Sequence, residues 1–425
     1  MTILTFIGVL LVTIALGTPI AFSLLICGFA LMIQLGNFDT QIVAQNLIEG
    51  TNSFPLMAVP FFMLAGELMN SGGMSKRIVG IAEALVGHVR GGLGYVAILA
   101  ATIVASISGS AVADAAAVAA LLIPMMRASG YNVPRSAGLI ASAGIIAPII
   151  PPSIPFIVFG VTTQLSITKL FLAGIVPGLL WAITLSLTWW FVAKKETAVV
   201  QKKFDRRHCL KALREGIWAL VLPVVIIGGM KIGVFTATEA AVVAVFYALV
   251  VGVFIYGELR FRQLPEVMLA ALKTASTVLF LIACAMVSAW LITIADIPTM
   301  TVELLQPFMD SPTLLLLVIM VLVLLIGTSL DIMPSILILG PILVPVVKEA
   351  GIDPVYFGVL FVMNVSLGLL SPPVGTVLNV VGGVSKAGMG NVIKGVWPFF
   401  FAETALLFLL VLFPQLVLVP MKWFA

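Results

Sequence analysis

The chain has 425 residues, of which 61% are hydrophobic and only 9% are charged, with a mean hydropathy of +1.23 and a formal net charge of +4. Soluble domains carry roughly 25% charged residues, so this composition excludes an ordinary soluble enzyme or binding domain. Apolar runs long enough to cross about 30 Å of hydrocarbon as helices recur along the chain. The composition therefore predicts an all-α protein that crosses a membrane several times.

The basic residues fall in a few short segments, so the net charge predicts no nucleic-acid partner. The cysteines, Cys27, Cys209 and Cys284, are scattered and predict neither a disulfide framework nor a metal cluster. An apolar stretch over residues 3–33 lacks the basic start of a signal peptide and is too long for its apolar core. We interpret it as one or two membrane helices that begin a scaffold over residues 1–75.

Residues 76–90 follow as an amphipathic arm helix along the membrane interface, where its basic side chains stay solvated. Arg90 and Arg127 then flank an apolar stretch, and the positive-inside rule puts both of them in the cytoplasm. A segment that enters and leaves on one side predicts a re-entrant hairpin over 92–127, with "SISGSAV" (106–112) at its tip. Irregular backbone at membrane depth is tolerated only inside protein or along a watery cavity, so this tip predicts part of a central site.

A broken helix is predicted over 136–168. Its stretch "GIIAPIIPPSIPF" (144–156) cannot continue a helix, because proline lacks the amide hydrogen and clashes with the preceding turn. A helix broken at mid-membrane leaves carbonyls free to bind cations and amides free to bind anions. A proline kink that only shapes packing is the alternative. A closing helix over 170–193 and a basic cytoplasmic loop over 194–214 complete this part of the chain.

An internal repeat relates the two halves, residues 1–193 and 215–425. A gapless shift of 221 residues superposes eight Gly or Pro positions, where composition alone predicts about two. These pairs are Gly8/Gly229, Gly36/Gly257, Pro124/Pro345, Gly130/Gly351, Pro151/Pro372, Pro152/Pro373, Gly174/Gly395 and Pro177/Pro398. The predicted segments of the second half are scaffold 215–295, arm helix 297–311, hairpin 312–348, broken helix 355–386 and closing helix 391–414.

Charge indicates how the halves are oriented. The shift matches the basic arm 76–90 to the acidic segment 297–311, and segments with opposite charge bias belong on opposite membrane faces. The sequence therefore predicts an inverted-topology repeat, which is typical of secondary transporters and favours alternating access over a channel. The second tip is "GTSLDIMP" (327–334), and the second break is "GLLSPPVGT" (368–376).

The two tips, the breaks "IIPPSIPF" and "LLSPPVGTVLNVVGGV" and the connection "VPVVKEAGIDPVYFG" resemble the large membrane subunit of a tripartite ATP-independent periplasmic (TRAP) transporter. The resemblance covers essentially the whole chain, and the C-terminal portion is most similar to sialic-acid systems. It implies an elevator-type fold in the bacterial inner membrane and sodium-driven uptake of an organic anion. That anion would be a carboxylated sugar such as sialic acid, or a C4-dicarboxylate.

The same resemblance implies two protein partners besides membrane lipid. A periplasmic binding protein would deliver the substrate, and a small four-helix membrane subunit, expected as a separate chain, would extend the scaffold. A stand-alone sodium–anion symporter is the alternative. The sequence does not predict an enzyme, because His88 and His208 lie in basic segments and neither a serine-hydrolase nor a zinc-protease motif occurs.

The resemblance also implies two sodium sites, each where a tip faces the break of the same half, bound mainly through backbone carbonyls. The first set is Ser108, Ala111, Ala147, Ile150 and Pro152, and the second is Ser329, Ile332, Gly368, Ser371 and Pro373. Ala147 stands where the family often has glycine.

Ser110 and Ser166 resemble substrate-pocket positions of the family, which implies that they contact the substrate. Asp114 and Asp331 are predicted to contact the substrate or to tune a sodium site. The two aspartates lie at membrane depth, where an ionisable side chain is costly and functional by default. Capping of a helix amide end is the alternative for both. Glu67 and Glu239 also fall within apolar stretches, and we expect structural roles for them.

Overall fold

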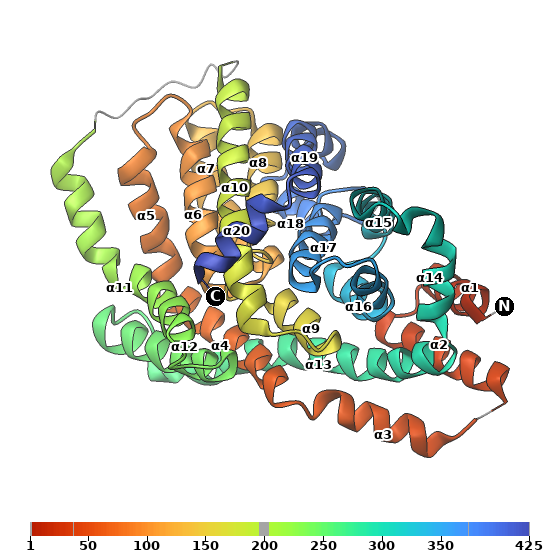
Figure 1. The fold of residues 1–425 in the computed structure, drawn as a ribbon. Coiled ribbons are helices and arrows are strands. Elements are labelled where there is room, and N and C mark those ends of the chain that lie inside the picture. The colour runs from red at the N-terminus through yellow and green to blue at the C-terminus, as the bar shows by residue number, and fades with distance from the viewer. Residues whose placement is uncertain (1, 37, 195–203, 373, 425) are drawn as a thin grey trace.

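The structure, a computed structural model, describes residues 2–36, 38–194, 204–372 and 374–424. These residues form helices joined by turns, with no strand among them (Figure 1). Seven helical stretches in the described ranges are long and apolar enough to cross a membrane. The predicted all-α, multi-pass membrane fold is confirmed.

Following the segments predicted from the sequence, we group the helices into the scaffold helices, which include the two arms, and the site helices (Figure 1); the two arm helices pack against both groups. The scaffold helices are α1 (Thr2–Ala15), α2 (Ile20–Leu35), α3 (Thr40–Thr51), α4 (Ala58–Ser71), α5 (Met74–Val86), α11 (Arg206–Lys231), α12 (Ala237–Val250), α13 (Leu264–Ile294) and α14 (Ile297–Met309). Short helices lie among them at Phe54–Met57 (η1), Val251–Ile255 (η2) and Phe261–Gln263 (η3).

The site helices include both hairpins and both broken helices. They are α6 (Gly92–Ser108), α7 (Ala111–Ala128), α8 (Val133–Gly144), α9 (Ile154–Thr162), α10 (Ile167–Ala193), α15 (Pro312–Gly327), α16 (Ile332–Glu349), α17 (Pro354–Gly368), α18 (Thr376–Ser385) and α19 (Met389–Leu412). A last helix, α20 (Gln415–Phe424), packs on α10.

The two halves interleave within the site helices. The second helix of each hairpin packs against a half-helix of the other half: α7 contacts α18, and α16 contacts α9. At the end of this first contact, the Arg127 guanidinium donates a 2.5 Å hydrogen bond to the carbonyl oxygen of Ser385. The closing helices behave likewise, because α19 packs on α8 and α10 packs on α17. The site helices of both halves therefore form one packed body.

The central helices are buried on every face. From Val355 to Gly368, every residue of α17 is buried, and so is every residue of α8 from Ser136 to Gly144. Large aromatic side chains fill the space around these helices, including Phe159, Phe357 and Phe361, whose rings contact one another. The predicted breaks therefore lie at the centre of the site helices.

The helix bounds follow the 221-residue shift closely. Residues 111–128 of α7 become 332–349, the bounds of α16, and the interruption between α8 and α9 is matched by one between α17 and α18. One segment departs from the relation: α3 and α4 are separated by η1, whereas their counterpart α13 is a single helix of 31 residues. The interruption contains Ser53 and Pro55, and the shift places Thr274 and Ser276, which do not break a helix, at these positions.

The predicted basic loop 194–214 is wrong in its second part. Residues 195–203 lie outside the described residues, but α11 already begins at Arg206. Asp205 caps this helix, since its carboxylate accepts a 2.9 Å hydrogen bond from the amide of Arg207. The Arg, Lys, Ala and Leu residues that follow are strong helix formers, so the basic segment continues directly into a scaffold helix.

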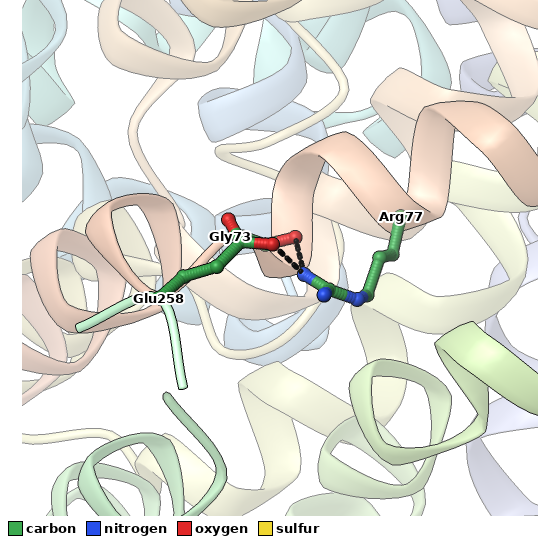
Figure 2. A network of polar contacts seen from close by, with 3 residues as sticks. All are labelled: Gly73, Arg77 and Glu258. Atoms are coloured by element: carbon green, nitrogen blue, oxygen red, sulfur yellow. Dashed lines mark hydrogen bonds and ion pairs between the residues drawn. The ribbon is translucent and has the colours of Figure 1, made fainter. Parts of the chain in front are cut away.

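An ion pair fixes the first arm helix, α5, to the scaffold (Figure 2). The Arg77 guanidinium lies 2.7 Å from the Glu258 carboxylate, donates a 3.0 Å hydrogen bond to the carbonyl of Gly73 and stacks on the Tyr256 ring. Gly73 has a φ of +75°, and a Cβ there would overlap the Glu258 carboxylate. The arm thus begins from a corner whose left-handed backbone favours glycine.

Candidate functional site

The first hairpin tip is held by its own polar side chains. The Ser108 hydroxyl donates a hydrogen bond to Oδ1 of Asp114 and accepts one of 3.2 Å from the amide of Ser110. Ser110 is the N-cap residue of α7, but its side chain makes no capping hydrogen bond. Three of the predicted residues, Ser108, Ser110 and Asp114, therefore lie close together around the hairpin tip.

This tip lies directly against the first break. Gly109 has a φ of +63°, and a Cβ there would overlap the carbonyl oxygen of Pro152. Below the tip, Gly144 of α8 leaves room for Ala115 of α7, since a Cβ on Gly144 would overlap its side chain. The structure therefore brings the first tip against Pro152 at the break, the two elements that contain the first predicted set.

Two further residues of the first set lie in this interruption, and the last one, Ala111, is the buried first residue of α7. Ala147 and Ile150 lie in turns between α8 and α9, and both are buried. Ile150 packs against Gly178 of α10, where any Cβ would overlap it. The backbone of 145–153 thus runs non-helically through the centre of the molecule, where unpaired carbonyl oxygens can bind a cation.

Ser153 belongs to this region and was not predicted as a site residue. It is fully buried and caps α9, because its hydroxyl accepts a 3.2 Å hydrogen bond from the amide of Phe156 and donates one to the carbonyl of Pro148. A serine placed directly after Pro151-Pro152, at the start of the second half-helix, is the sequence signal that identifies such a cap.

The second tip meets the second break through glycines. A Cβ on Gly368 would overlap the carbonyl oxygen of Gly327, so the end of α15 lies on the end of α17. At the tip, Asp331 caps α16 by accepting a 2.8 Å hydrogen bond from the amide of Ile332, as the capping alternative predicts. Ser371 is buried at the break and donates a 3.0 Å hydrogen bond to the Gly368 carbonyl.

Two predicted residues, Ser329 and Ser166, lie apart from these contacts. Ser329 is exposed at the second tip, and Pro373 lies outside the described residues. Ser166 is exposed beyond the far end of α9, a nine-residue helix about 13 Å long, and caps α10 by accepting a 3.3 Å hydrogen bond from the amide of Lys169. The structure therefore does not bring Ser166 to the first break.

A small cavity lies between the first tip and the scaffold. It has a volume of about 110 Å³, and its polar lining comes from Ser108, Ser110 and Asp114 at the tip, Glu67 and Asn70 on α4, Ser75 on α5 and Thr274 on α13. Asp114 is only 3% exposed, and its Oδ2 finds no hydrogen-bond partner among the described residues. Glu67, for which the sequence predicts a structural role, therefore faces the same space as Asp114.

The two histidines lie elsewhere. His88 and His208 line a larger cavity of about 580 Å³ between α5, α7 and α11, together with Glu83 and Tyr131. Among the described residues, no cluster of three His, Cys, Asp or Glu side chains could hold a metal ion. The chemistry available at the tips is thus that of carbonyl, hydroxyl and carboxylate oxygens, which suits alkali cations.

Comparisons with known proteins agree with this arrangement. Residues 7–416 match the sequence profile of the family described as "Tripartite ATP-independent periplasmic transporter, DctM component". The chain is 57% identical over its whole length, and over the whole relative, to the 2,3-diketo-L-gulonate TRAP transporter large permease protein YiaN of Escherichia coli. It is 39% identical to the sialic acid TRAP transporter large permease protein SiaM of Vibrio cholerae, over 95% of this chain and 94% of the relative.

A solved structure shares the fold. The crystal structure of the YdaH transporter of Alcanivorax borkumensis superposes with a TM-score of 0.63 over 88% of each chain, at 15% sequence identity. The predicted resemblance to TRAP large subunits is thus confirmed. The similarity to sialic-acid systems is confirmed in part, because a relative named for a different sugar acid is considerably more identical.

Proposed function

Because this chain belongs to the DctM family of TRAP transporter large subunits in the bacterial inner membrane, we propose that it carries out sodium-coupled uptake of a sugar acid. The observation that supports sodium coupling most directly is that each hairpin tip packs on the break of its own half, at Gly109–Pro152 and at Gly327–Gly368. The first pairing sets the non-helical backbone at Pro152 against its tip, and the second brings the C-terminal ends of α15 and α17 together. Backbone carbonyls at such breaks and helix ends suit a desolvated alkali cation.

The proposed substrate is a carboxylated sugar. The identity of 57% to a permease named for 2,3-diketo-L-gulonate, against 39% to one named for sialic acid, favours the smaller sugar acid over the larger one. The N-terminus of α7 can hold the carboxylate, because its first amides have no side-chain cap and carry the positive end of the helix dipole. Ser110 and Asp331, at the N-termini of α7 and α16, would then contact the substrate from the two tips.

The proposed movement is of the elevator type. The site helices pack with one another across the two halves, and they contact the scaffold mainly through α4, α5, α13 and α14. A body of this kind can slide as a unit, carrying both sodium sites with it. A cysteine pair joining α13 to α16, with Cα atoms within about 7 Å, should stop transport reversibly while sodium binding persists. Full transport in the crosslinked protein would refute the sliding movement.

The proposed partners are a small four-helix membrane subunit and a periplasmic binding protein that delivers the substrate. The decisive experiment reconstitutes the large and small subunits in vesicles, adds the binding protein, and measures uptake of diketogulonate, sialic acid and a C4-dicarboxylate. Uptake should require an inward sodium gradient and should stop when potassium replaces sodium. Equal uptake with only a proton gradient would refute sodium coupling. Uptake without the binding protein would identify a stand-alone symporter.

A further inference from the structure

We propose that the cavity between the first hairpin tip and α4 is a further sodium site, shared between the site helices and the scaffold and distinct from the two sites at the breaks. The inference deepens the proposed sodium coupling and rests on it for the identity of the ion. Asp114 contributes from α7 and Glu67 from α4, so neither group of helices holds the site alone.

The strongest observation is the unpartnered oxygen of Asp114. The side chain is 97% buried; Oδ1 accepts the Ser108 hydrogen bond, while Oδ2 has no partner among the described residues, and the side chain lines the cavity. Burying a carboxylate oxygen in this way costs free energy unless a cation or a hydrogen-bond donor contacts it. Asp114 itself lines the cavity, so a group bound there is well placed to lie against this unpartnered oxygen.

The other lining groups fit a hard cation. Glu67 supplies a second carboxylate, Asn70 an amide oxygen, and Ser75, Ser110 and Thr274 hydroxyl oxygens. Lys273, the neighbour of Thr274, is exposed and does not line the cavity, so no described lysine or arginine in this lining neutralises the two carboxylates. Two carboxylates that face one small space repel each other, and a cation between them removes that repulsion.

The volume of about 110 Å³ has room for one ion together with several waters. Carboxylate, hydroxyl, amide and water oxygens together can complete the shell of a sodium ion without help from the breaks. The cavity lies on the α4 side of the tip, whereas Gly109 of the same tip faces Pro152 on the other side. A sodium ion bound here is therefore additional to the one proposed at the first break.

The position of the cavity gives this ion a specific role. Gly66 of α4 lies against Ser108, since a Cβ on Gly66 would be 3.1 Å from the Ser108 Cβ, so the tip and the scaffold are in direct contact here. When the site helices slide, Asp114 moves away from Glu67 and the site is taken apart. Sodium in this cavity thus stabilises one end position of the movement and must leave before the site helices can travel.

Equilibrium binding of radioactive sodium to the purified complex of large and small subunits tests the proposal without any transport measurement. Glu67→Gln keeps the size of the side chain, lies outside both break sites, and should bind one sodium ion fewer per chain than the wild type. Glu67→Ala should give the same result if the glutamine variant folds poorly. The matched control, Glu303→Gln, removes an exposed carboxylate from α14 and should bind as many ions as the wild type.

The outcomes separate this inference from the proposed function. An unchanged sodium count in both Glu67 variants would overturn this site and leave the two break sites in place. A wild-type complex that binds no sodium would overturn sodium coupling itself. Displacement of the additional ion by an equal concentration of calcium would overturn the choice of a monovalent ion, because a two-carboxylate site built for calcium prefers the higher charge.

Discussion

The two hairpin tips carry the same residue types at equivalent positions, but in exchanged order. The 221-residue shift pairs Ser110 with Asp331 and Asp114 with Ser335. In the first tip the serine stands at the N-cap and the carboxylate lies one turn inside α7; in the second tip the carboxylate is the cap, and the serine lies one turn inside α16. The buried Ser335 hydroxyl donates a 2.9 Å hydrogen bond to the carbonyl of Asp331.

The first tip is held by a hydrogen bond between its own side chains, whereas the equivalent serine of the second tip is exposed. Ser108 is tied to Asp114 at the first tip, whereas its counterpart Ser329 is exposed and its nearest hydroxyl, that of Thr328, is 3.5 Å away. The glycines are exchanged as well: Gly109 of the first tip corresponds to Leu330, and Ala147 of the first break corresponds to Gly368. One half achieves close packing with a glycine at the tip, and the other with a glycine at the break.

We expect the largest effect from Gly109→Ala. Left-handed backbone costs an alanine about 1–2 kcal/mol, and the new Cβ also overlaps the Pro152 carbonyl, so the first tip should be forced off its break. Sodium-driven uptake should fall by at least about tenfold. Gly130→Ala is the matched control, since Gly130 has a φ of +79° with open space around it and would add only the backbone cost. Equal losses in both variants would show that contact with Pro152 is unimportant.

The second test makes the second break resemble the first. In Gly368→Ala the new Cβ meets the backbone of Gly327, which cannot move aside as a flexible side chain can, so sodium affinity and uptake should both drop severalfold. Gly383→Ala, on α18 with nothing within 4 Å of the added Cβ, should retain both. A Gly368→Ala protein with wild-type sodium affinity would mean that the halves do not divide the packing as described.

The third test compares the two equivalent serines. A leucine at either position should reduce uptake strongly, because a bulky side chain intrudes where an ion is proposed to bind. Ser108→Leu should be the more damaging, since it also removes the hydrogen bond to Asp114, and losing the partner of a buried polar group costs about 1–3 kcal/mol. Uptake and thermal stability of the two purified variants would measure the difference. If Ser329→Leu proved the more harmful, the second tip would be the tighter one.

The smallest effect concerns the cap on α16. Asp331→Ala removes the acceptor for the Ile332 amide and should lower the stability of the protein by about 1 kcal/mol. Asp331→Asn keeps an acceptor and should restore this stability, yet its changed charge should still alter the substrate concentration needed for half-maximal uptake. Thermal unfolding and uptake kinetics separate the two roles. An asparagine variant with wild-type kinetics would reduce Asp331 to a structural cap.

The positions of the hairpins and breaks were predictable because glycine and proline mark them. A hairpin turn at Gly109 or a helix that stops before Pro148 leaves a direct trace in the sequence, and the 221-residue shift transfers that trace to the other half. Helix α11 was missed at its start because positive charge marks a membrane face and says little about whether the backbone is helical.

The directions in which side chains point were harder to predict. Glu67 lies in an apolar stretch, and only the packing of α4 against the first tip turns it toward Asp114. Ser166 follows the first break at a plausible sequence distance, but the length of α9 carries it away from that break. Such placements depend on which faces of distant helices meet, and this information is not contained in local sequence patterns.

Under the proposed sodium coupling, the hydrogen bond from Arg127 to the Ser385 carbonyl bears on how efficiently the protein would use an ion gradient. It fastens the last turn of α7, in one half, to the last residue of α18, in the other. If each half could move independently, an ion could cross alone and part of the gradient would be dissipated without cargo. If the proposed sliding movement holds, a link between the halves would make them cross together, and the number of ions moved with each imported molecule would stay fixed.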